Sequence, residues 1–304
     1  MKVLLTGGAG YLGNSVAHAL ASRPEITEIV ILDNFARQNY GLLLSDNKQG
    51  LGRCRILVDD ILNSRGLRRA MDGVDCVCHL AALAPSPFSD DHPHAFDQIN
   101  HWGTAEVVYA AEELGVERFV YVSSGAVYGF GERVASHREN VMPVTSYGAS
   151  KLDGERHVER FGESRSAVIL RSGTIYGVNA SARFDTFINK FVLHAALGKA
   201  VQIHGDGNQQ RPVVQVDAIA NVVASAALGQ IEPGVYDAVE RNSSVNDIVD
   251  TIRSLEVSIE SIYLNQQHAM RHLKVDPDAR LSAWLTSRVS LKENVAKMLG
   301  SVSL

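Results

Sequence analysis

A phenol and an ammonium group stand four residues apart in the sequence, at Tyr147 and Lys151. On a helix, side chains at this spacing project from the same face. A tyrosine with its ordinary pKa of about 10 is a poor base at neutral pH unless a nearby cation stabilises its phenolate. Lys151 would be that cation, so the pair predicts a proton transfer to and from a hydroxyl group.

Two serines precede a glycine in residues 121–129, which read YVSSGAVYG. The apolar residues before the serines predict a strand, and ligands of an open parallel sheet bind where its strands end. There, Ser124 would donate a hydrogen bond to a substrate oxygen and position it for Tyr147. We therefore expect Ser124, Tyr147 and Lys151 to be the catalytic residues of an enzyme that acts on a hydroxyl-bearing substrate.

A glycine-rich turn lies between the first predicted strand and the first predicted helix, in residues 7–13, which read GGAGYLG. Glycines permit a tight turn, let the backbone approach a pyrophosphate and let the helix pack on the strand, while the helix N-terminus supplies positive potential. Asp33 follows Gly13 by twenty residues, at the end of the second predicted strand, where a carboxylate would bind an adenosine ribose. Because a carboxylate would repel a 2′-phosphate, NAD is favoured over NADP, which Arg37 leaves as the alternative.

The order of the expected elements is that of a parallel sheet covered by helices. Strand-like runs lie at residues 2–6, 28–32, 55–58, 75–80, 118–122 and 167–171. Helix-like runs, with apolar residues at three- and four-residue spacing, lie at residues 14–21, 63–71, 96–114 and 147–161. The fold class expected is therefore α/β, with a Rossmann-type doubly wound parallel sheet and a smaller C-terminal α/β substrate lobe.

After about Arg171 this alternation gives way to loops that contain Gly, Asn and Arg, with helical runs at residues 184–197, 217–228 and 245–255. We expect residues 1–172 to form an NAD-binding domain and residues 173–304 to form a substrate-binding lobe, some segments of which pack back on the first sheet. The sequence has no low-complexity linker, so the two parts should be closely joined, with a cleft between them.

The composition of the 304 residues excludes several classes of protein. Hydrophobic residues make up 45% and charged residues 21%, which are ordinary values for a globular protein. A formal net charge of -5 provides no field that would attract nucleic acid or an anionic membrane, so neither is expected as a partner. The apolar run at the start breaks at Gly7, and no later run reaches the roughly 18 residues that span a bilayer, so we expect a cytoplasmic protein.

The three cysteines, an odd number, offer no disulfide framework, which suits a reducing cytosol. Residues 76–79, which read CVCH, could suggest a metal site. They lie within the apolar run 74–83, where alternation on a strand puts Cys76 and Cys78 on one face with no second ligand pair in view. We therefore expect a buried strand here and no metal.

Together, these motifs resemble those of the extended short-chain dehydrogenase/reductases, specifically the NAD-dependent epimerase/dehydratase group typified by UDP-glucose 4-epimerase. The likeness runs along nearly the whole chain. It is carried by the glycine turn, Asp60-Ile61, HLAA at residues 79–82, Asn100 with Gly103-Thr104, SSGAVYG at residues 123–129, Tyr147 with Lys151, Arg171 with Tyr176-Gly177, GDGNQQR at residues 205–211, and Val216-Asp217.

The resemblance implies a cofactor site, a substrate site and an assembly. NAD would be bound by Gly7, Gly10, Tyr11, Leu12, Gly13, Asp33, Asn34, Asp60, Ile61, Leu80, Ala81, Ala82, Asn100, Ser123, Tyr147 and Lys151. The substrate would be contacted by Ser124, Thr174 and Arg211. Arg211 would grip a nucleotide phosphate, with a surface or inter-lobe ion pair as the alternative. The family likeness and the apolar faces of the helical runs 96–114 and 147–161 also imply a homodimer joined by a four-helix interface.

The reaction implied is epimerisation of a nucleotide sugar, at C4 of a UDP-hexose or a derivative. Tyr147 would take the proton from a sugar hydroxyl while its carbon gives hydride to NAD, and the ketone would then receive hydride on its other face. Two alternatives are an NAD(P)-dependent 4-ketosugar reductase or alcohol dehydrogenase, and a non-catalytic NAD-binding regulator. Regulators of this kind commonly lose the tyrosine or the lysine, and this chain retains both.

Several positions depart from the family's pattern. Residues 125–126, GA, follow Ser124 where the 4,6-dehydratases carry an Asp-Glu pair after a threonine, so water elimination is not expected. Thr174 stands where many UDP-sugar epimerases have asparagine, and Ala84 stands where some have lysine. Residues 215–218, QVDA, lack the usual His or Tyr and the second Asp. These changes leave the identity of the sugar and the nucleotide open.

Overall fold

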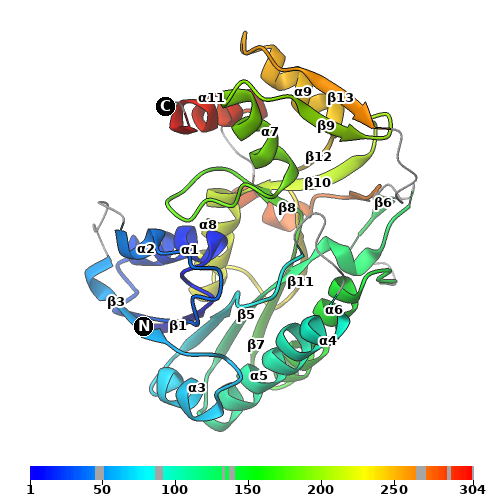
Figure 1. The fold of residues 1–304 in the computed structure, drawn as a ribbon. Helices are drawn as coiled ribbons and strands as arrows, with labels where there is room; N and C mark the ends of the chain where they lie inside the picture. The colour runs from blue at the N-terminus through cyan, green and yellow to red at the C-terminus, as the bar shows by residue number, and fades with distance from the viewer. Residues whose placement is uncertain are drawn as a thin grey trace.

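A seven-stranded parallel sheet forms the centre of the protein, in a computed structural model that describes residues 1–44, 51–85, 92–131, 134–136, 141–264, 272–285 and 289–302 (Figure 1). From one edge to the other its strands are β11 (Gly234–Ala238), β7 (Ser166–Ser172), β5 (Arg118–Ser124), β4 (Cys76–His79), β1 (Lys2–Thr6), β2 (Glu28–Asp33) and β3 (Cys54–Val58). All neighbouring strands in it are parallel. The expected Rossmann-type doubly wound sheet is confirmed, and its strand order reverses between β1 and β4, where such folds bind ligands.

Alternate residues of β1 pack into separate cores on the two faces of the sheet. Val3 and Leu5 lie in the core that contains side chains of α1 and α8, whereas Leu4 lies in the core under α3, α5 and α6. Burial on both faces is what a parallel sheet covered by helices requires of its strands. The helices of these two layers are α1 (Tyr11–Ala21), α3 (Ser64–Met71), α5 (Gly103–Glu113), α6 (Ser146–Gly162) and α8 (Val216–Ala227).

The helical run expected at residues 96–114 is divided in the structure. It comprises α4 (Pro93–Phe96), the π-helical segment η2 (Asp97–Trp102) and α5. Asn100 lies in η2, is fully buried and hydrogen-bonds the main chain of Leu83. A π-helical turn departs from the three- and four-residue spacing of an α-helix. In this π-helical segment the polar side chain of Asn100 points into the protein, and the apolar pattern of the sequence does not predict that.

The residues after β7 build a second core. Side chains of α7 (Phe187–Ala196), α9 (Val245–Arg253) and α11 (Leu291–Val302) pack there with those of two strands, β9 (Val201–His204) and β10 (Gln210–Gln215). β10 lies between β8 (Thr174–Tyr176) and β12 (Arg241–Ser244), and β9 pairs with β13 (Ser261–Leu264). The prediction of loops after Arg171 is therefore partly wrong, because short strands form there. These strands are short and several are polar: β12 reads RNSS and β10 reads QRPVVQ, without the alternation that marks a strand.

Two later segments return to the first sheet, since β11 forms its edge and α8 covers one face. The remaining elements are α2 (Gly41–Leu44), η1 (Leu51–Arg53), η3 (Gly125–Tyr128), β6 (Val134–Ala135), β14 (Lys274–Val275), η4 (Ala279–Leu281) and α10 (Ser282–Leu285). Within the described ranges, no helix is both long and apolar enough to cross a bilayer.

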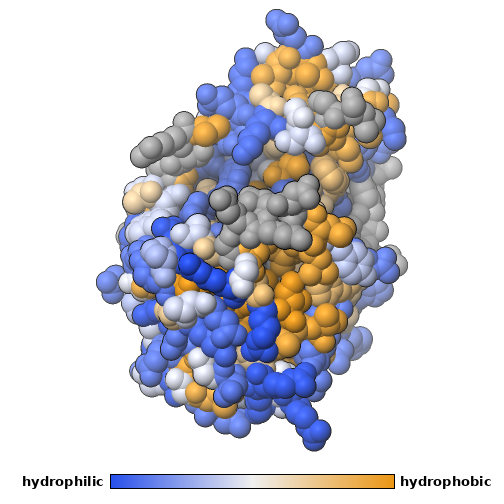
Figure 2. Space-filling view, turned by 90° about the vertical axis from the view of Figure 1, so that its left-hand side faces the viewer, coloured by the Kyte–Doolittle hydropathy of each residue, from blue (hydrophilic) through white to orange (hydrophobic). Residues whose placement is uncertain are grey.

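The surface mixes polar and apolar residues. Figure 2, which faces the left-hand side of Figure 1, shows hydrophilic residues over much of the lower left and hydrophobic residues gathered toward the lower right. More than half of the accessible surface of an ordinary folded protein comes from apolar atoms. This face therefore carries no functional assignment by itself.

Candidate active site

Ser124 and Tyr147 meet where β5 ends and α6 begins. Ser124 is the last residue of β5, and the turn η3 follows it directly. Gly148 on α6 packs against this turn so closely that a Cβ there would lie 2.5 Å from the carbonyl oxygen of Ala126. The Ser124 hydroxyl is close enough to Tyr147 to lower the pKa of its phenol. The structure thus brings together the two residues that the sequence proposed for the substrate hydroxyl.

Opposing effects act on the proton of Tyr147. Burial raises the pKa of its phenol, while the hydrogen bond with Ser124 and the positive charge of Arg183 lower it. The edge of one ring packs against the face of the other between Phe96 and Tyr147, with centroids 5.8 Å apart. A buried phenol needs positive charge nearby to ionise. Arg183 was missed by the sequence analysis because it reaches the site from the loop after β8, where no motif marks it.

Lys151 lies one helical turn after Tyr147 on α6 and is 2% exposed. Its Nζ lies 4.1 Å from the centre of the Tyr121 ring, a cation–π contact. Burial lowers the pKa of its ammonium group to about 7, against the opposing charge of Glu155 one turn further along the helix. Lys151 therefore stands near the midpoint of its titration at neutral pH, where small changes around it alter its charge.

We expect this buried lysine to make folding stability depend on pH. Its pKa is 10.5 in the unfolded chain and about 7 in the folded protein. Below about pH 7 both states carry the proton, and the folded state bears the full cost of a buried charge. Between the two pKa values the unfolded chain binds more protons, so the free energy of unfolding should rise with pH.

The variant Lys151→Met keeps an unbranched side chain but has no charge to bury. Denaturant unfolding of both proteins from about pH 6 to about pH 10 isolates the contribution of Lys151, because the other titrating groups are shared. The stability of the wild-type protein should increase relative to that of the variant over this range. A constant difference between the two proteins would contradict the assignment of a lowered pKa to Lys151.

A buried ion pair joins α6, which carries Lys151, to β7, the neighbour of the strand β5 that ends in Ser124. Arg171 on β7 contacts Glu155 on α6 through Nη2 and Oε2 at 2.7 Å, and its Nε contacts both carboxylate oxygens. Glu155 also accepts from the Ser123 hydroxyl, and Arg171 donates to Tyr128, whose hydroxyl donates to Asp237. Burial alone would lower the pKa of Arg171, but the hydrogen bonds and charge of Glu155 raise it. Ser123, expected at the cofactor, directs its hydroxyl into this network.

In the glycine turn after β1, contacts leave no room for a side chain at Gly7 and Gly13. A Cβ on Gly7, whose φ is 71°, would lie 2.6 Å from the nitrogen of Ala81, and one on Gly13 would lie 2.3 Å from the carbonyl oxygen of Gly7. At Gly10, the N-cap of α1, a Cβ would meet only that same oxygen, at 3.2 Å. No described side chain caps this helix. An open backbone surface before uncapped helix amides fits the pyrophosphate of NAD.

Asp33, Asn34 and Asp60 meet at the ends of β2 and β3. Asp33 accepts a hydrogen bond from the amide of Ala9 in the glycine turn, at 2.9 Å. Asn34 Nδ2 donates to Asp60 Oδ2 at 2.7 Å. The carboxylate that the sequence placed at an adenosine ribose is thus fixed beside the turn that would hold the pyrophosphate. The side chain of Ile61, which follows, packs in the core of the sheet.

Residues 80–82, expected at the cofactor, follow β4 and are half-buried. Asn100 holds the chain just beyond them. Its amide nitrogen donates to the Leu83 carbonyl at 2.9 Å and to the Ser150 hydroxyl at 3.1 Å, and its oxygen accepts from the Leu83 amide at 2.8 Å. Asn100 therefore braces the segment after β4 against α6, the helix of Tyr147 and Lys151.

The CVCH residues of β4 are all buried. His79 has a hydroxyl at each ring nitrogen, that of Thr6 at 2.7 Å and that of Thr104 at 3.0 Å. Burial lowers the pKa of this imidazole to about 3. His79 therefore serves as a neutral link between β1, β4 and α5.

Thr174 and Arg211 come together on the second sheet. Val213 on β10 is paired with Thr174 on β8, and Arg211 precedes Val213 by two residues. Pro212 lies between Arg211 and Val213 on β10. Its ring is 3.9 Å from where a Cβ on Gly125 would be. Pro212, the neighbour of Arg211, therefore adjoins the turn that follows Ser124.

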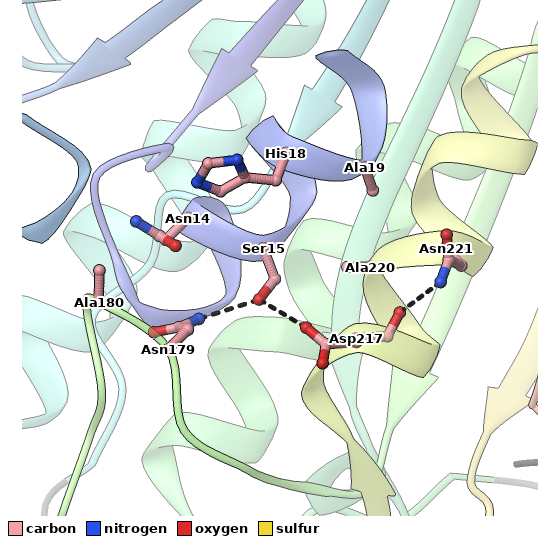
Figure 3. Close-up of a pocket in the computed structure, with 9 residues that line it drawn as sticks. All are labelled: Asn14, Ser15, His18, Ala19, Asn179, Ala180, Asp217, Ala220 and Asn221. Carbon is pink, nitrogen blue, oxygen red and sulfur yellow. Dashed lines mark hydrogen bonds between the residues drawn. The ribbon is translucent and has the colours of Figure 1, made fainter. Parts of the chain in front are cut away.

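A cavity of about 420 Å³ lies elsewhere, between α1, α8 and the loop after β8 (Figure 3). Figure 3 shows a hydrogen-bonded chain along its wall, in which Asn179 donates to Ser15 at 2.9 Å and Ser15 donates to Asp217 at 3.2 Å. Its lining includes none of Ser124, Tyr147 and Lys151. The cavity is therefore distinct from the place where these three residues meet, and the chain of hydrogen bonds ties the loop after β8 to both helices.

Comparison with known proteins adds a family model, described as the NAD-dependent epimerase/dehydratase family, that matches residues 3–237. A Bacillus subtilis (strain 168) protein named uncharacterized UDP-glucose epimerase YtcB is 29% identical over 229 residues, which are 74% of this chain and 72% of that protein. The dTDP-D-glucose 4,6-dehydratase of Mus musculus is 30% identical over 241 residues, 76% of this chain and 66% of that protein.

Among solved structures, that of MoeE5 in complex with UDP-glucuronic acid and NAD is similar over 99% of this chain and 98% of that chain. The TM-score is 0.83 and the sequence identity is 26%. The likeness therefore includes the second lobe as well as the seven-stranded sheet.

Proposed function

Because the chain belongs to the NAD-dependent epimerase/dehydratase family of extended short-chain dehydrogenases/reductases, we propose that it is a nucleotide-sugar epimerase acting at C4 of a UDP-hexose or a derivative. Its cofactor is NAD, and it is an enzyme of sugar-nucleotide chemistry. The observation that carries the proposal is geometric: α6, which bears Tyr147 and the buried Lys151, packs closely on the turn that follows Ser124.

Each catalytic residue has a separate task in this reaction. The glycine turn and Asp33 would hold NAD, which supplies the hydride acceptor and donor when bound. Ser124 donates a hydrogen bond to the sugar oxygen, and the Tyr147 phenolate takes the hydroxyl proton as the carbon is oxidised to a ketone. Charged Lys151 favours the phenolate. In the return step the Tyr147 phenol gives its proton back to the sugar oxygen, so the reaction is neutral in protons and in electrons.

The turn after Ser124 supports epimerisation over dehydration. Gly125 and Ala126, in η3, offer no side chain that could carry a proton. Elimination of water requires an acid and a base at neighbouring carbons of the sugar. The relative from Mus musculus is named a dehydratase, so the choice between the two reactions depends on these positions and not on overall identity.

We assign residues 1–172 to the NAD-binding domain and residues 173–304 to the substrate lobe, with β11 and α8 of the latter packed on the first sheet. In the lobe, Thr174 and Arg211 are proposed to contact the substrate, with the Arg211 guanidinium on a phosphate of the nucleotide. The place of Pro212, the neighbour of Arg211, beside the turn after Ser124 supports this assignment. The cofactor contacts proposed are those named from the sequence.

The test is incubation of the purified protein, without added cofactor, with UDP-glucose, UDP-N-acetylglucosamine and UDP-glucuronate, followed by chromatographic separation of the C4 epimers. An epimer should form from at least one substrate until equilibrium is reached. Failure with every member of a broad sugar-nucleotide panel would refute the proposal. Stoichiometric consumption of NADH with a ketosugar nucleotide would indicate a reductase instead.

We further propose that the protein is a homodimer. Its interface would be formed by the helical segment η2–α5 and by α6. Trp102 and Tyr109 are 54% and 45% exposed and lie seven residues apart, on one face of this helical segment. The ring of His157 on α6 packs near both, with centroid distances of 6.5 and 6.1 Å. Large exposed aromatic residues on adjacent helices suit a helix–helix interface.

Light scattering at micromolar concentration should give the mass of a dimer, and Trp102→Glu should give that of a monomer because it buries a charge in the interface. Tyr263→Glu is the matched control, since Tyr263 is 52% exposed on β13 in the other lobe. A monomer mass for the wild-type protein would disprove the dimer.

A further inference from the structure

Residues 177–186, between β8 and α7, are tied to the glycine turn after β1, and we call them the strap. Ser181 Oγ donates to the carbonyl of Ala9 at 3.2 Å, and the Tyr11 hydroxyl donates to the carbonyl of Gly177 at 2.6 Å. Asn179 donates to the carbonyl of Tyr11 at 2.9 Å. A segment of the substrate lobe thus runs along the turn that would hold the NAD pyrophosphate.

The strap also contacts the loops that follow β2 and β4. On the β2 side, Asn39 Nδ2 donates to the carbonyl of Ser181 at 3.0 Å, and a Cβ on Gly41 would lie 1.9 Å from the carbonyl oxygen of Ala180. On the β4 side, Arg183 Nη2 donates to the carbonyl of Pro85 at 2.7 Å. Because β2 and β4 flank β1 in the sheet, the strap spans the edge of the dinucleotide crevice from one side to the other.

Two guanidinium groups converge under this strap. Arg37, from the loop after β2, donates through Nη2 to the carbonyl of Ala84 at 2.9 Å, next to the Pro85 carbonyl that Arg183 contacts. Asp185 pairs with Arg183. Two cations and one carboxylate leave these three side chains with one net positive charge.

The positive charge of Arg183 affects the pKa of groups from the glycine turn, from α6 and from the loop after β2. Its charge opposes the burial that raises the pKa of Tyr11, at the glycine turn, and it acts in the same sense on Tyr147, at the catalytic end. Burial and the repulsion from Arg183 both lower the pKa of Arg37. Because Arg37 and Arg183 donate to the adjacent carbonyls of Ala84 and Pro85, an anion placed between the two guanidinium groups would relieve the repulsion between them.

We propose that Arg37 and Arg183 are ligands of the NAD pyrophosphate, additional to the main-chain amides of the glycine turn, so that the substrate lobe contributes directly to holding the cofactor. The inference rests on the proposed function for the place of the dinucleotide. Guanidinium groups bind phosphate oxygens through paired charge-assisted hydrogen bonds. Since the strap carries Arg183, release of NAD requires that contacts between the two lobes open.

The test compares Arg37→Gln, Arg183→Gln and Arg183→Lys with Arg253→Gln, a control whose exposed ion pair with Asp250 lies on α9 in the second lobe. NAD content after purification, the rate of NAD exchange, and the thermal shifts produced by ADP and by adenosine are measured. Both glutamine variants should bind ADP and NAD about tenfold or more weakly. Adenosine, which lacks phosphate, should bind them as it binds the control, and Arg183→Lys should recover part of the loss.

Equal weakening of ADP and adenosine would overturn the proposal, because it would mean that the arginines only support the shape of the site. Unchanged ADP binding in both glutamine variants would overturn it as well. If Arg183→Gln does not fold, Arg37→Gln decides the matter alone, since Arg37 lies on a loop of the other lobe. These readouts need no turnover, so failure of the epimerase proposal would appear in the sugar-nucleotide panel and not here.

Discussion

Replacing Tyr147 by phenylalanine is expected to lower kcat for epimerisation by about a hundredfold to ten-thousandfold, the usual contribution of a positioned acid–base group. The substitution removes the oxygen that accepts and returns the proton, but it keeps the ring that packs against Phe96 with centroids 5.8 Å apart. KM should change little, because Ser124 and the substrate lobe still contact the sugar nucleotide. Steady-state kinetics on the substrate that the wild-type protein converts provide the measurement.

The control for this variant is Tyr263→Phe, which removes a hydroxyl hydrogen-bonded to Asn246 on the surface of the second lobe. It should retain wild-type kcat. The NAD content of both variants is measured as well, which separates a defect in proton transfer from a defect in cofactor binding. Full activity of Tyr147→Phe with NAD bound would assign the proton transfer to another group.

The first half of the fold was predictable because its signals are local. The turn GGAGYLG needs glycine at Gly7 and Gly13 since a Cβ at either position would collide with backbone atoms. Apolar residues on both faces of β1 follow from its place at the centre of a parallel sheet. The link from Asp33 to this turn, through the amide of Ala9, spans 24 residues but joins the ends of the neighbouring strands β1 and β2.

The second lobe was harder to predict because tertiary pairing and not residue pattern defines its strands. β8 has three residues, and β10 contains a proline and three polar side chains. Arg183 belongs to the same problem, since tertiary hydrogen bonds of the strap, among them those to three separate loops, bring it near Tyr147. Nothing in its sequence neighbourhood specifies those contacts.

Glu155 is different, because the sequence did contain a signal for it. It lies four residues after Lys151 on the same helix, so its charge had to fall near the lysine. Its partner Arg171 is a charged residue that follows four apolar residues on a buried strand, a position that requires a buried counter-charge. Pairing the two observations would have predicted the ion pair behind the site.

Arg171→Met is expected to lower the free energy of unfolding by about 3–5 kcal/mol, the typical cost of leaving one member of a buried ion pair without its partner. Side-chain exposure is 6% for Arg171 and 1% for Glu155, so water cannot replace the lost guanidinium. Arg253→Met is the control, because its ion pair with Asp250 is exposed to solvent. The atoms Arg253 Nη1 and Asp250 Oδ1 are 3.3 Å apart. This control should change stability by no more than about 0.5 kcal/mol.

The double variant, Arg171→Met with Glu155→Leu, distinguishes the charge from the packing. Removing both members leaves no uncompensated ion at this position, so the double variant should be more stable than Arg171→Met alone. Urea unfolding of the wild-type protein, the two single variants and the double variant gives the coupling energy of the pair. If the losses of the single variants simply add, the stability of this region comes from the shape of the two side chains and not from their charges.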